Sequence, residues 1–147
     1  MRCELLHPDL AEPLAELFEA LRSAGDERWF HPHPLTREEA ERLCAYEGRD
    51  LYAVLVDGER VVAYGMLRGW DAGFEIPNLG IAVHPEARGR GAGRALIERL
   101  HEEARSRGAR RVRLTVYTAN DPARRLYEQL GYELEEKGDD MVGYLAL

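Results

Sequence analysis

Cysteine is scarce in this sequence: Cys3 and Cys44 are the only two, and they form no CxxC pair. This argues against a disulfide scaffold or a cysteine zinc site and predicts two reduced thiols that pack in the interior. Long apolar runs are missing as well, since none approaches the roughly 20 residues that cross a bilayer. The opening MRCELLHPDL lacks the uninterrupted apolar stretch of a signal peptide. We therefore expect a cytoplasmic protein that does not bind membranes.

An excess of positive charge is also missing, because 27 acidic residues outnumber 20 basic ones and the formal net charge is −7. This balance argues against a surface that attracts nucleic acid as a whole, so no nucleic-acid partner is expected. The basic residues are nevertheless clustered, and a local basic region on an acidic protein predicts one small polyanionic ligand. The clusters comprise Arg88, Arg90, Arg94 and Arg99, followed by Arg105, Arg107, Arg110, Arg111 and Arg113.

Length and periodicity predict one domain over residues 1–147, with no repeat and no linker. Thr36 and Glu39 form a capping box before a helix, and Asp57-Gly58 marks a hairpin between two apolar runs. The order β-α-α-β-β-β-α-β-α-β-β predicts an α/β fold with a mixed, mostly antiparallel sheet flanked by helices. The expected helices are 8–25, 37–47, 93–108 and 120–131, and the strands include 74–83, in which Pro77 marks a bulge or an edge position.

The stretch HPEARGRGAG gathers three glycines and two arginines between a predicted strand and a predicted helix. It is not a Walker loop, because Gly93 is followed by Arg94-Ala95, and it is not a dinucleotide motif, because the third glycine of GxGxxG would fall on Arg94. The remaining RxxGxG pattern brings backbone N–H groups together at the positive end of a helix, which favours an anion. The alternative is a surface turn with solvated arginines.

The blocks IAVHPEARGRGAGRALI and VRLTVYTANDPARRLYEQLGYE together resemble the GNAT superfamily of acetyl-CoA-dependent N-acetyltransferases. The first is similar to that family's Q/R-x-x-G-x-G/A cofactor motif, and the second to its following strand and helix. The resemblance covers residues 78–133. It implies acetyl-CoA as cosubstrate, no metal, and direct attack by a primary amine in a ternary complex.

The same resemblance implies a coenzyme A site. The backbone of the glycine loop would cradle the pyrophosphate, the strand before it would pair with the pantetheine arm, and one side chain would hold the arm further along. The loop residues are Arg88, Gly89, Arg90, Gly91, Ala92, Gly93 and Arg94, the strand residues are Ile81, Ala82 and Val83, and the further side chain is Asn120.

Two catalytic residues are expected. Tyr127 matches the family's general acid, and a phenol that stays protonated at neutral pH suits protonation of a thiolate; the alternative is a packing aromatic. In many members a glutamate at the position of Pro77 acts as the general base. Glu75, two residues earlier, would point to the same face of a regular strand. Glu75 is therefore the candidate base, with a solvent-facing carboxylate as the alternative, and His84 is a weaker option. Thr115 replaces the glutamate of members that acetylate protein N-termini, which disfavours that acceptor.

The segment DERWFHPHPL lies where this family builds its acceptor pocket. The pocket would be lined by Trp29, Phe30, His31 and His33, facing Trp70 and Asp71 across the sheet. Aromatic and polar groups of this kind suit a small amine, an amino sugar or a peptide end. A lid without a role in specificity is the alternative, and a metal site lacks a third ligand.

Other functions also remain open. A non-catalytic acyl-CoA-binding sensor or interaction module would need the same loop but no base, and a general phosphate binder would ignore the pantetheine arm. Many members of the superfamily dimerise, so a homodimer is a further expectation.

Overall fold

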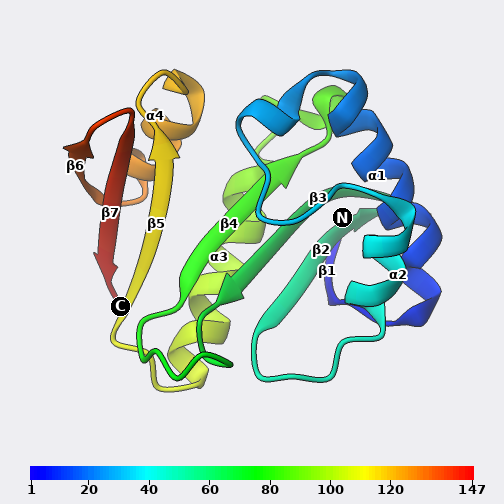
Figure 1. Ribbon diagram of the computed structural model, residues 1–147, viewed down its shortest axis with the longest axis horizontal. Helices are drawn as coiled ribbons and strands as arrows, with labels where there is room; N and C mark the ends of the chain where they lie inside the picture. The colour runs from blue at the N-terminus through cyan, green and yellow to red at the C-terminus, as the bar shows by residue number, and fades with distance from the viewer.

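The computed structural model describes residues 1–147, which form one seven-stranded sheet with helices on both faces (Figure 1). The strand order is β1-β2-β3-β4-β5-β7-β6, and every neighbouring pair is antiparallel except β4 and β5. The predicted α/β fold with a mostly antiparallel sheet is confirmed. The strands are β1 Arg2–Leu5, β2 Leu51–Asp57, β3 Arg60–Arg68, β4 Asn78–Val83, β5 Arg111–Tyr117, β6 Glu133–Lys137 and β7 Asp140–Ala146.

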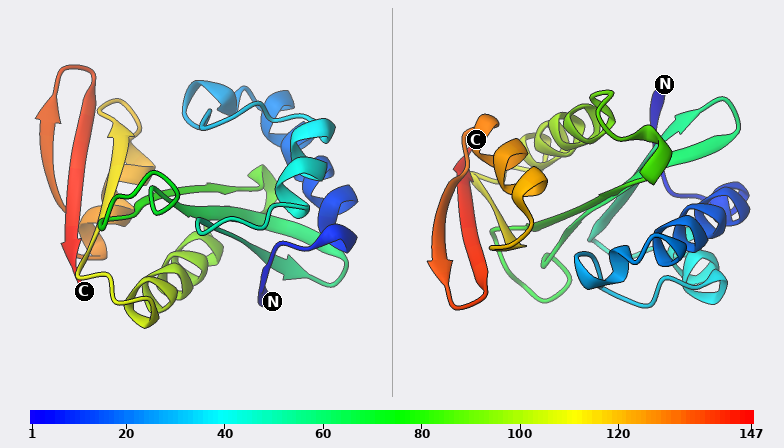
Figure 2. Two further views of the ribbon diagram at one scale, coloured as in Figure 1. Left: turned by 60° about the horizontal axis from the view of Figure 1, so that its bottom comes forward. Right: turned by 90° about the horizontal axis from the view of Figure 1, so that it is seen from above.

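The helices divide between the two faces of the sheet (Figure 2). Helices α1 (Ala11–Ser23) and α2 (Arg37–Cys44) cover one face, and α3 (Ala92–Ser106) and α4 (Asp121–Gln129) cover the other. Three short 3-10 turns, η1 (Pro8–Leu10), η2 (Asp26–Arg28) and η3 (Pro85–Ala87), connect these elements. None of the helices is long and apolar enough to cross a membrane.

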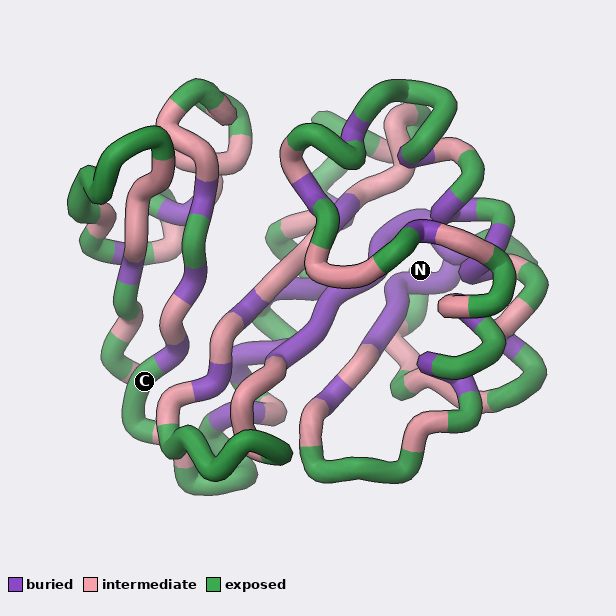
Figure 3. Tube along the Cα trace, in the orientation of Figure 1, coloured by how far each residue is buried: buried purple, intermediate pink, exposed green.

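Two apolar clusters hold these layers together. Strand residues alternate between the faces, so Val54 packs with α1 and α2 whereas Ala53 and Leu55 pack with α3. The central strands are buried along most of their length, while the edge strand β6 is exposed and acidic (Figure 3). Both cysteines are free, and burial raises the pKa of the Cys44 thiol to about 11, which makes it a packing residue.

Local sequence chemistry sets several element boundaries as predicted. The Thr36 hydroxyl accepts the backbone N–H of Glu39 at 3.2 Å and so begins α2, while the Glu39 carboxylate pairs with Arg42 instead of completing the capping box. Gly58 adopts a positive φ of 63° in the hairpin between β2 and β3, a conformation that costs glycine little.

The feature that shapes the molecule is the separation of β4 from β5. These parallel strands pair at only two positions, Asn78 with Arg113 and Leu79 with Leu114. Beyond them β5 stays paired with β7 as far as Tyr117, while β4 turns away from it (Figure 1). Residues 80–83 of β4 therefore have a strand on one side only.

The expectation of a strand from residue 74 is wrong. Strand β4 begins at Asn78, and the preceding segment makes turns with positive φ at Gly69 (127°) and Gly73 (88°). Pro77 has no N–H to donate to a ladder, although its carbonyl accepts the backbone N–H of Arg113 at 3.0 Å. Glu75 thus lies in a loop, and the alternation of a regular strand does not fix its direction.

Gly65 tests how closely α3 packs on the sheet. A Cβ at this position of β3 would meet Leu100 Cδ1 at 2.9 Å and Leu96 Cδ2 at 3.2 Å. We expect Gly65→Val to lower the free energy of unfolding by about 1–3 kcal/mol through overpacking, as measured by urea denaturation. Gly80→Ala is the control, because its Cβ would meet mainly the flexible end of Met66. Equal losses in the two variants would contradict this account.

Candidate active site

The glycine loop joins the end of β4 to the start of α3. Gly89 and Gly91 have φ values of 76° and 81°, which side-chain-bearing residues rarely adopt. No side chain caps α3, and its first turn holds no acidic residue, so its leading N–H groups are free of a side-chain acceptor. Gly93 has a different role, because a Cβ there would lie 3.3 Å from Val83 Cγ2 and 3.5 Å from Leu126 Cδ2. The third glycine therefore lets α3 pack closely on β4 and α4.

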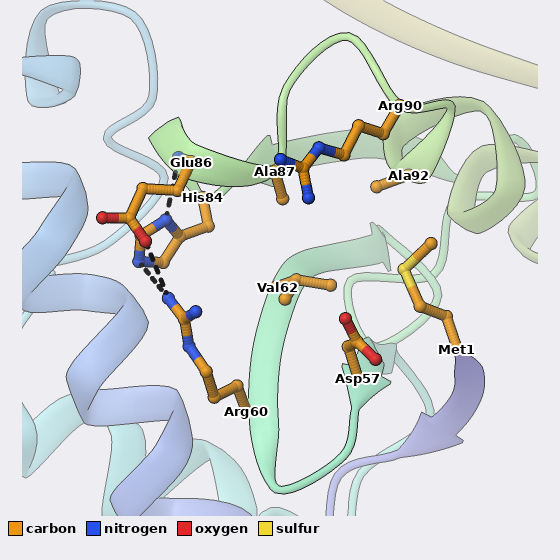
Figure 4. A pocket seen from close by; sticks show the side chains of 9 residues that line it. All are labelled: Met1, Asp57, Arg60, Val62, His84, Glu86, Ala87, Arg90 and Ala92. Carbon is orange, nitrogen blue, oxygen red and sulfur yellow. Dashed lines mark hydrogen bonds and ion pairs between the residues drawn. The ribbon is translucent and has the colours of Figure 1, made fainter.

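The three arginines of the loop point to different neighbours. Arg88 donates to the Asp26 carboxylate and, at 3.1 Å, to the Val83 carbonyl, while Arg94 donates to Gln129 at 3.3 Å. The Arg90 side chain turns back toward Ala87, over the hairpin of β2 and β3 (Figure 4). The donors that this loop can offer to an anion are thus its backbone N–H groups rather than the guanidinium groups.

His84 belongs to the turn on the hairpin side of this loop. Its Nδ1 accepts the backbone N–H of Glu86 at 3.0 Å, and Arg60 contacts both side chains (Figure 4). Burial and the Arg60 charge lower the pKa of His84. The residue caps η3, as a turn histidine does.

Tyr127 lies on α4, in the cluster beneath α3, and its side chain is almost fully buried. Its ring meets the Tyr132 ring edge-on at 5.8 Å, and the Tyr132 hydroxyl lies 2.7 Å from Nε2 of His101. Burial raises the pKa of Tyr127, so its hydroxyl stays protonated at neutral pH. This hydroxyl makes no hydrogen bond with the protein and is not sealed from solvent. Tyr127 therefore packs in the core and still presents a free O–H.

Asn120 forms the N-cap of α4. Its side-chain oxygen accepts the backbone N–H of Ala123 at 3.5 Å. The amide nitrogen is left without a hydrogen-bond partner, at the end of α4 that follows β5.

The aromatic loop comprises residues 29–35, after η2. Part of it packs in the core and part of it reaches β5. Phe30 and His33 turn inward, where the Tyr64 hydroxyl donates to Nε2 of His33 at 2.9 Å. Burial lowers the pKa of His33, and its Nδ1 donates to the Pro34 carbonyl. Trp29 and His31 instead reach β5.

His31 and Tyr117 join that loop to β5. The two side chains lie 3.0 Å apart, from His31 Nε2 to the Tyr117 hydroxyl, and Nδ1 of His31 lies 2.6 Å from the Glu27 carbonyl. His31 and His33 therefore contact different strands, and no group of three or more His, Cys, Asp or Glu residues could hold a metal ion.

Trp70 and Asp71 do not face the aromatic loop, so this expectation is wrong. Trp70 packs with the cluster on the α3 side, under the guanidinium of Arg107 at 4.7 Å. Asp71 accepts the backbone N–H of Arg49 at 2.7 Å and the hydroxyl of Tyr46. Both residues belong to the loop at the start of β4, the end of the strand away from the glycines.

Glu75 lies in the same loop and is exposed to solvent. It lines a surface pocket with arginines of the turn between α3 and β5. Only a regular strand through Pro77 would have directed Glu75 toward the expected cofactor. Strand β4 begins at Asn78, so that strand is absent.

Sequence reasoning missed three residues that hold the aromatic loop in place. Asp26 is nearly buried and pairs with Arg88, Arg68 donates to the Pro32 carbonyl at 3.2 Å, and Tyr117 contacts His31. Of these three, only Tyr117 could have been placed from the sequence, because alternation along β5 puts it on the same face as Thr115 and Arg113.

The sequence pattern of the Acetyltransferase (GNAT) family matches residues 14–132. The chain belongs to the GNAT family of acetyltransferases. A curated GNAT relative, the mycothiol acetyltransferase of Streptomyces coelicolor, is 32% identical over 123 residues, or 82% of this chain. The chain spans 36% of that relative, about a third of its length.

Solved structures of other acetyltransferase proteins share the fold. The GNAT domain of S. lividans PAT has a TM-score of 0.84 and 22% identity, over 99% of this chain and 90% of that one. The PaiA N-acetyltransferase of Thermoplasma acidophilum, solved in complex with coenzyme A, has a TM-score of 0.80 and 15% identity over the full length of both chains.

The pair of Asp26 and Arg88 ties the aromatic loop to the glycine loop. The Asp26 side chain is 10% exposed and that of Arg88 48%. We expect Asp26→Asn to lower the free energy of unfolding by about 1–3 kcal/mol, because a charge-assisted hydrogen bond from a nearly buried carboxylate is lost. Chemical denaturation measures the change.

The matched control is Glu12→Gln, which breaks a pair with Arg37 whose two side chains are 63% and 53% exposed. Solvent screens this pair, so the control should change stability little. A loss in Asp26→Asn no larger than in the control would refute a structural role for the pair of Asp26 and Arg88.

Proposed function

We propose that this protein transfers an acetyl group from acetyl-CoA to a primary amine by direct attack in a ternary complex. The observation that carries the proposal is the free edge of β4 beside the glycine loop. A backbone edge with no neighbouring strand can pair with the amides of a pantetheine arm, and a loop of converging N–H groups can hold the pyrophosphate at one end of that arm.

The cofactor residues follow from this placement. The backbone of Ile81, Ala82 and Val83 would bind the arm, and residues 88–94 would hold the pyrophosphate mainly through their N–H groups. The free amide nitrogen of Asn120 would donate to a carbonyl of the arm. The PaiA N-acetyltransferase, which shares the fold and was solved with coenzyme A, supports this choice of cosubstrate.

The chemistry requires stabilisation of two charges. As the amine attacks the thioester carbon, negative charge develops on the carbonyl oxygen, and a backbone N–H near Ile81 would stabilise it. When the carbon–sulfur bond breaks, Tyr127 would protonate the departing thiolate. The raised pKa of Tyr127 keeps the donor protonated.

The acceptor side supports a small amine, an amino sugar or a peptide end. It combines aromatic rings from Trp29 and Tyr117 with polar groups from His31 and from the face of β5 that carries Thr115. The main alternative, a non-catalytic acyl-CoA sensor, would have no use for a free hydroxyl at Tyr127.

Thermal stabilisation and thiol release test the proposal together. Acetyl-CoA and coenzyme A should stabilise the protein well beyond ADP, because ADP lacks the pantetheine arm. Amines including lysine, spermidine, glucosamine and an alanyl peptide should be screened for coenzyme A release. Tyr127→Phe should lower kcat about 100-fold while leaving the stabilisation by coenzyme A intact.

Tyr144→Phe is the matched control, since Tyr144 is exposed on β7 and lies under Arg111. Stabilisation without thiol release from any amine would favour the sensor. Equal stabilisation by ADP and acetyl-CoA would favour a general phosphate binder instead.

Glu75→Gln tests the base that the sequence predicted. Glu75 is exposed at the end of the sheet away from the glycine loop, so kcat and KM should stay within about twofold of the unmodified enzyme. A fall in kcat of about 100-fold would restore Glu75 as the general base and contradict its placement outside the site.

A further inference from the structure

His31 is held in a defined orientation and tautomer by the backbone of its own loop. A carbonyl oxygen can only accept, so Nδ1 carries the proton that is donated to Glu27 O at 2.6 Å. In the neutral ring Nε2 then bears a lone pair, and it accepts the Tyr117 hydroxyl proton at 3.0 Å. A base whose second nitrogen is fixed by a hydrogen bond has the arrangement of a catalytic histidine.

Tyr117 lies beside the place where the thioester is expected. The last paired positions of the two strands are Asn78 with Arg113 and Leu79 with Leu114. Continued in the same register, β5 brings Tyr117 to the level of Ala82, one residue from Ile81, across the opening between the strands. Tyr117 shares a face with Thr115, which points to the same side of the sheet as the aromatic loop.

Charged groups of both signs lie on this side of the sheet. Arg28 lies over Trp29 at 4.9 Å, and Arg68 and Arg113 point to the same side of the sheet. No carboxylate forms an ion pair with His31, and Asp140 lies opposite Tyr117 in the ladder of β5 and β7. The arginines favour the neutral form of a bound amine and Asp140 favours the ammonium form, so a base is needed to remove the proton.

We propose that His31 and Tyr117 together form the general base of this acetyltransferase. The inference rests on the proposed function above. It replaces Glu75, and it gives a catalytic role to a residue that the sequence placed only in the pocket wall.

The proton balance is complete with these groups. The ammonium of the acceptor gives one proton to the Tyr117 oxygen as the Tyr117 proton moves to His31 Nε2, and the imidazolium later releases that proton to solvent. The neutral nitrogen then forms a bond to the thioester carbon, and the carbon–sulfur bond breaks with its electron pair on sulfur. Tyr127 protonates the sulfur and then takes a proton back from the acylated nitrogen, so that the product is a neutral amide.

The test compares acceptors that do and do not need a base. With the fastest amine of the panel, His31→Gln and Tyr117→Phe should each lower kcat about 100-fold, with KM for acetyl-CoA unchanged. With hydroxylamine, which is largely neutral at neutral pH, the same variants should lose far less. Imidazole added to His31→Ala should restore part of the rate with the amine.

His7→Gln and Tyr144→Phe serve as controls, because the His7 ring bonds to Glu4 near β1 and Tyr144 pairs with Arg113, four residues from Tyr117 along β5. A rate lost equally with both nucleophiles, without rescue by imidazole, would show that His31 merely anchors its loop and would overturn the inference. Full activity of His31→Gln would also overturn it and leave the proposed function standing. No turnover by the unmodified protein with any nucleophile would refute the proposed function itself.

Discussion

The parting of β4 from β5 is the constraint on which the rest of the molecule depends. If β4 and β5 stayed paired along their whole length, no free strand edge would lie next to the glycine loop. Because pairing stops after Leu79 and Leu114, the backbone of residues 80–83 is available to a ligand. The helices keep this opening in place: α3 packs closely on β4 through Gly93, and α4 extends from the end of β5. The proposed cofactor site is thus a gap in a hydrogen-bond ladder.

Features that depend on a few consecutive residues could be predicted from the sequence. Thr36 with Glu39 and Asp57-Gly58 set a helix start and a hairpin through local hydrogen bonds and backbone conformation. The order of elements and the glycine loop followed from periodicity and spacing, and the family resemblance followed from two motif blocks in sequence. The same logic explains the glycine at 93 only in part, since its close contact with Val83 is tertiary.

The features that could not be predicted depend on distant parts of the chain. Alternation along a strand was extended through Pro77 to Glu75, although the strand begins only at Asn78. The face on which Trp70 lies is decided by the path of a loop and by Arg107, which the local sequence does not specify. The contact between His31 and Tyr117 joins residues 86 positions apart, and neither neighbourhood contains a pattern that points to the other.

Amide hydrogen exchange with and without coenzyme A tests the central claim most directly. If the free edge of β4 binds the pantetheine arm and the loop binds the pyrophosphate, amides of residues 80–83 and 88–94 should become protected when coenzyme A is added. The loop of residues 69–77, at the other end of β4, should exchange as before. Binding of coenzyme A with no added protection in either of the first two segments, or with protection centred on residues 69–77, would contradict this account of the site.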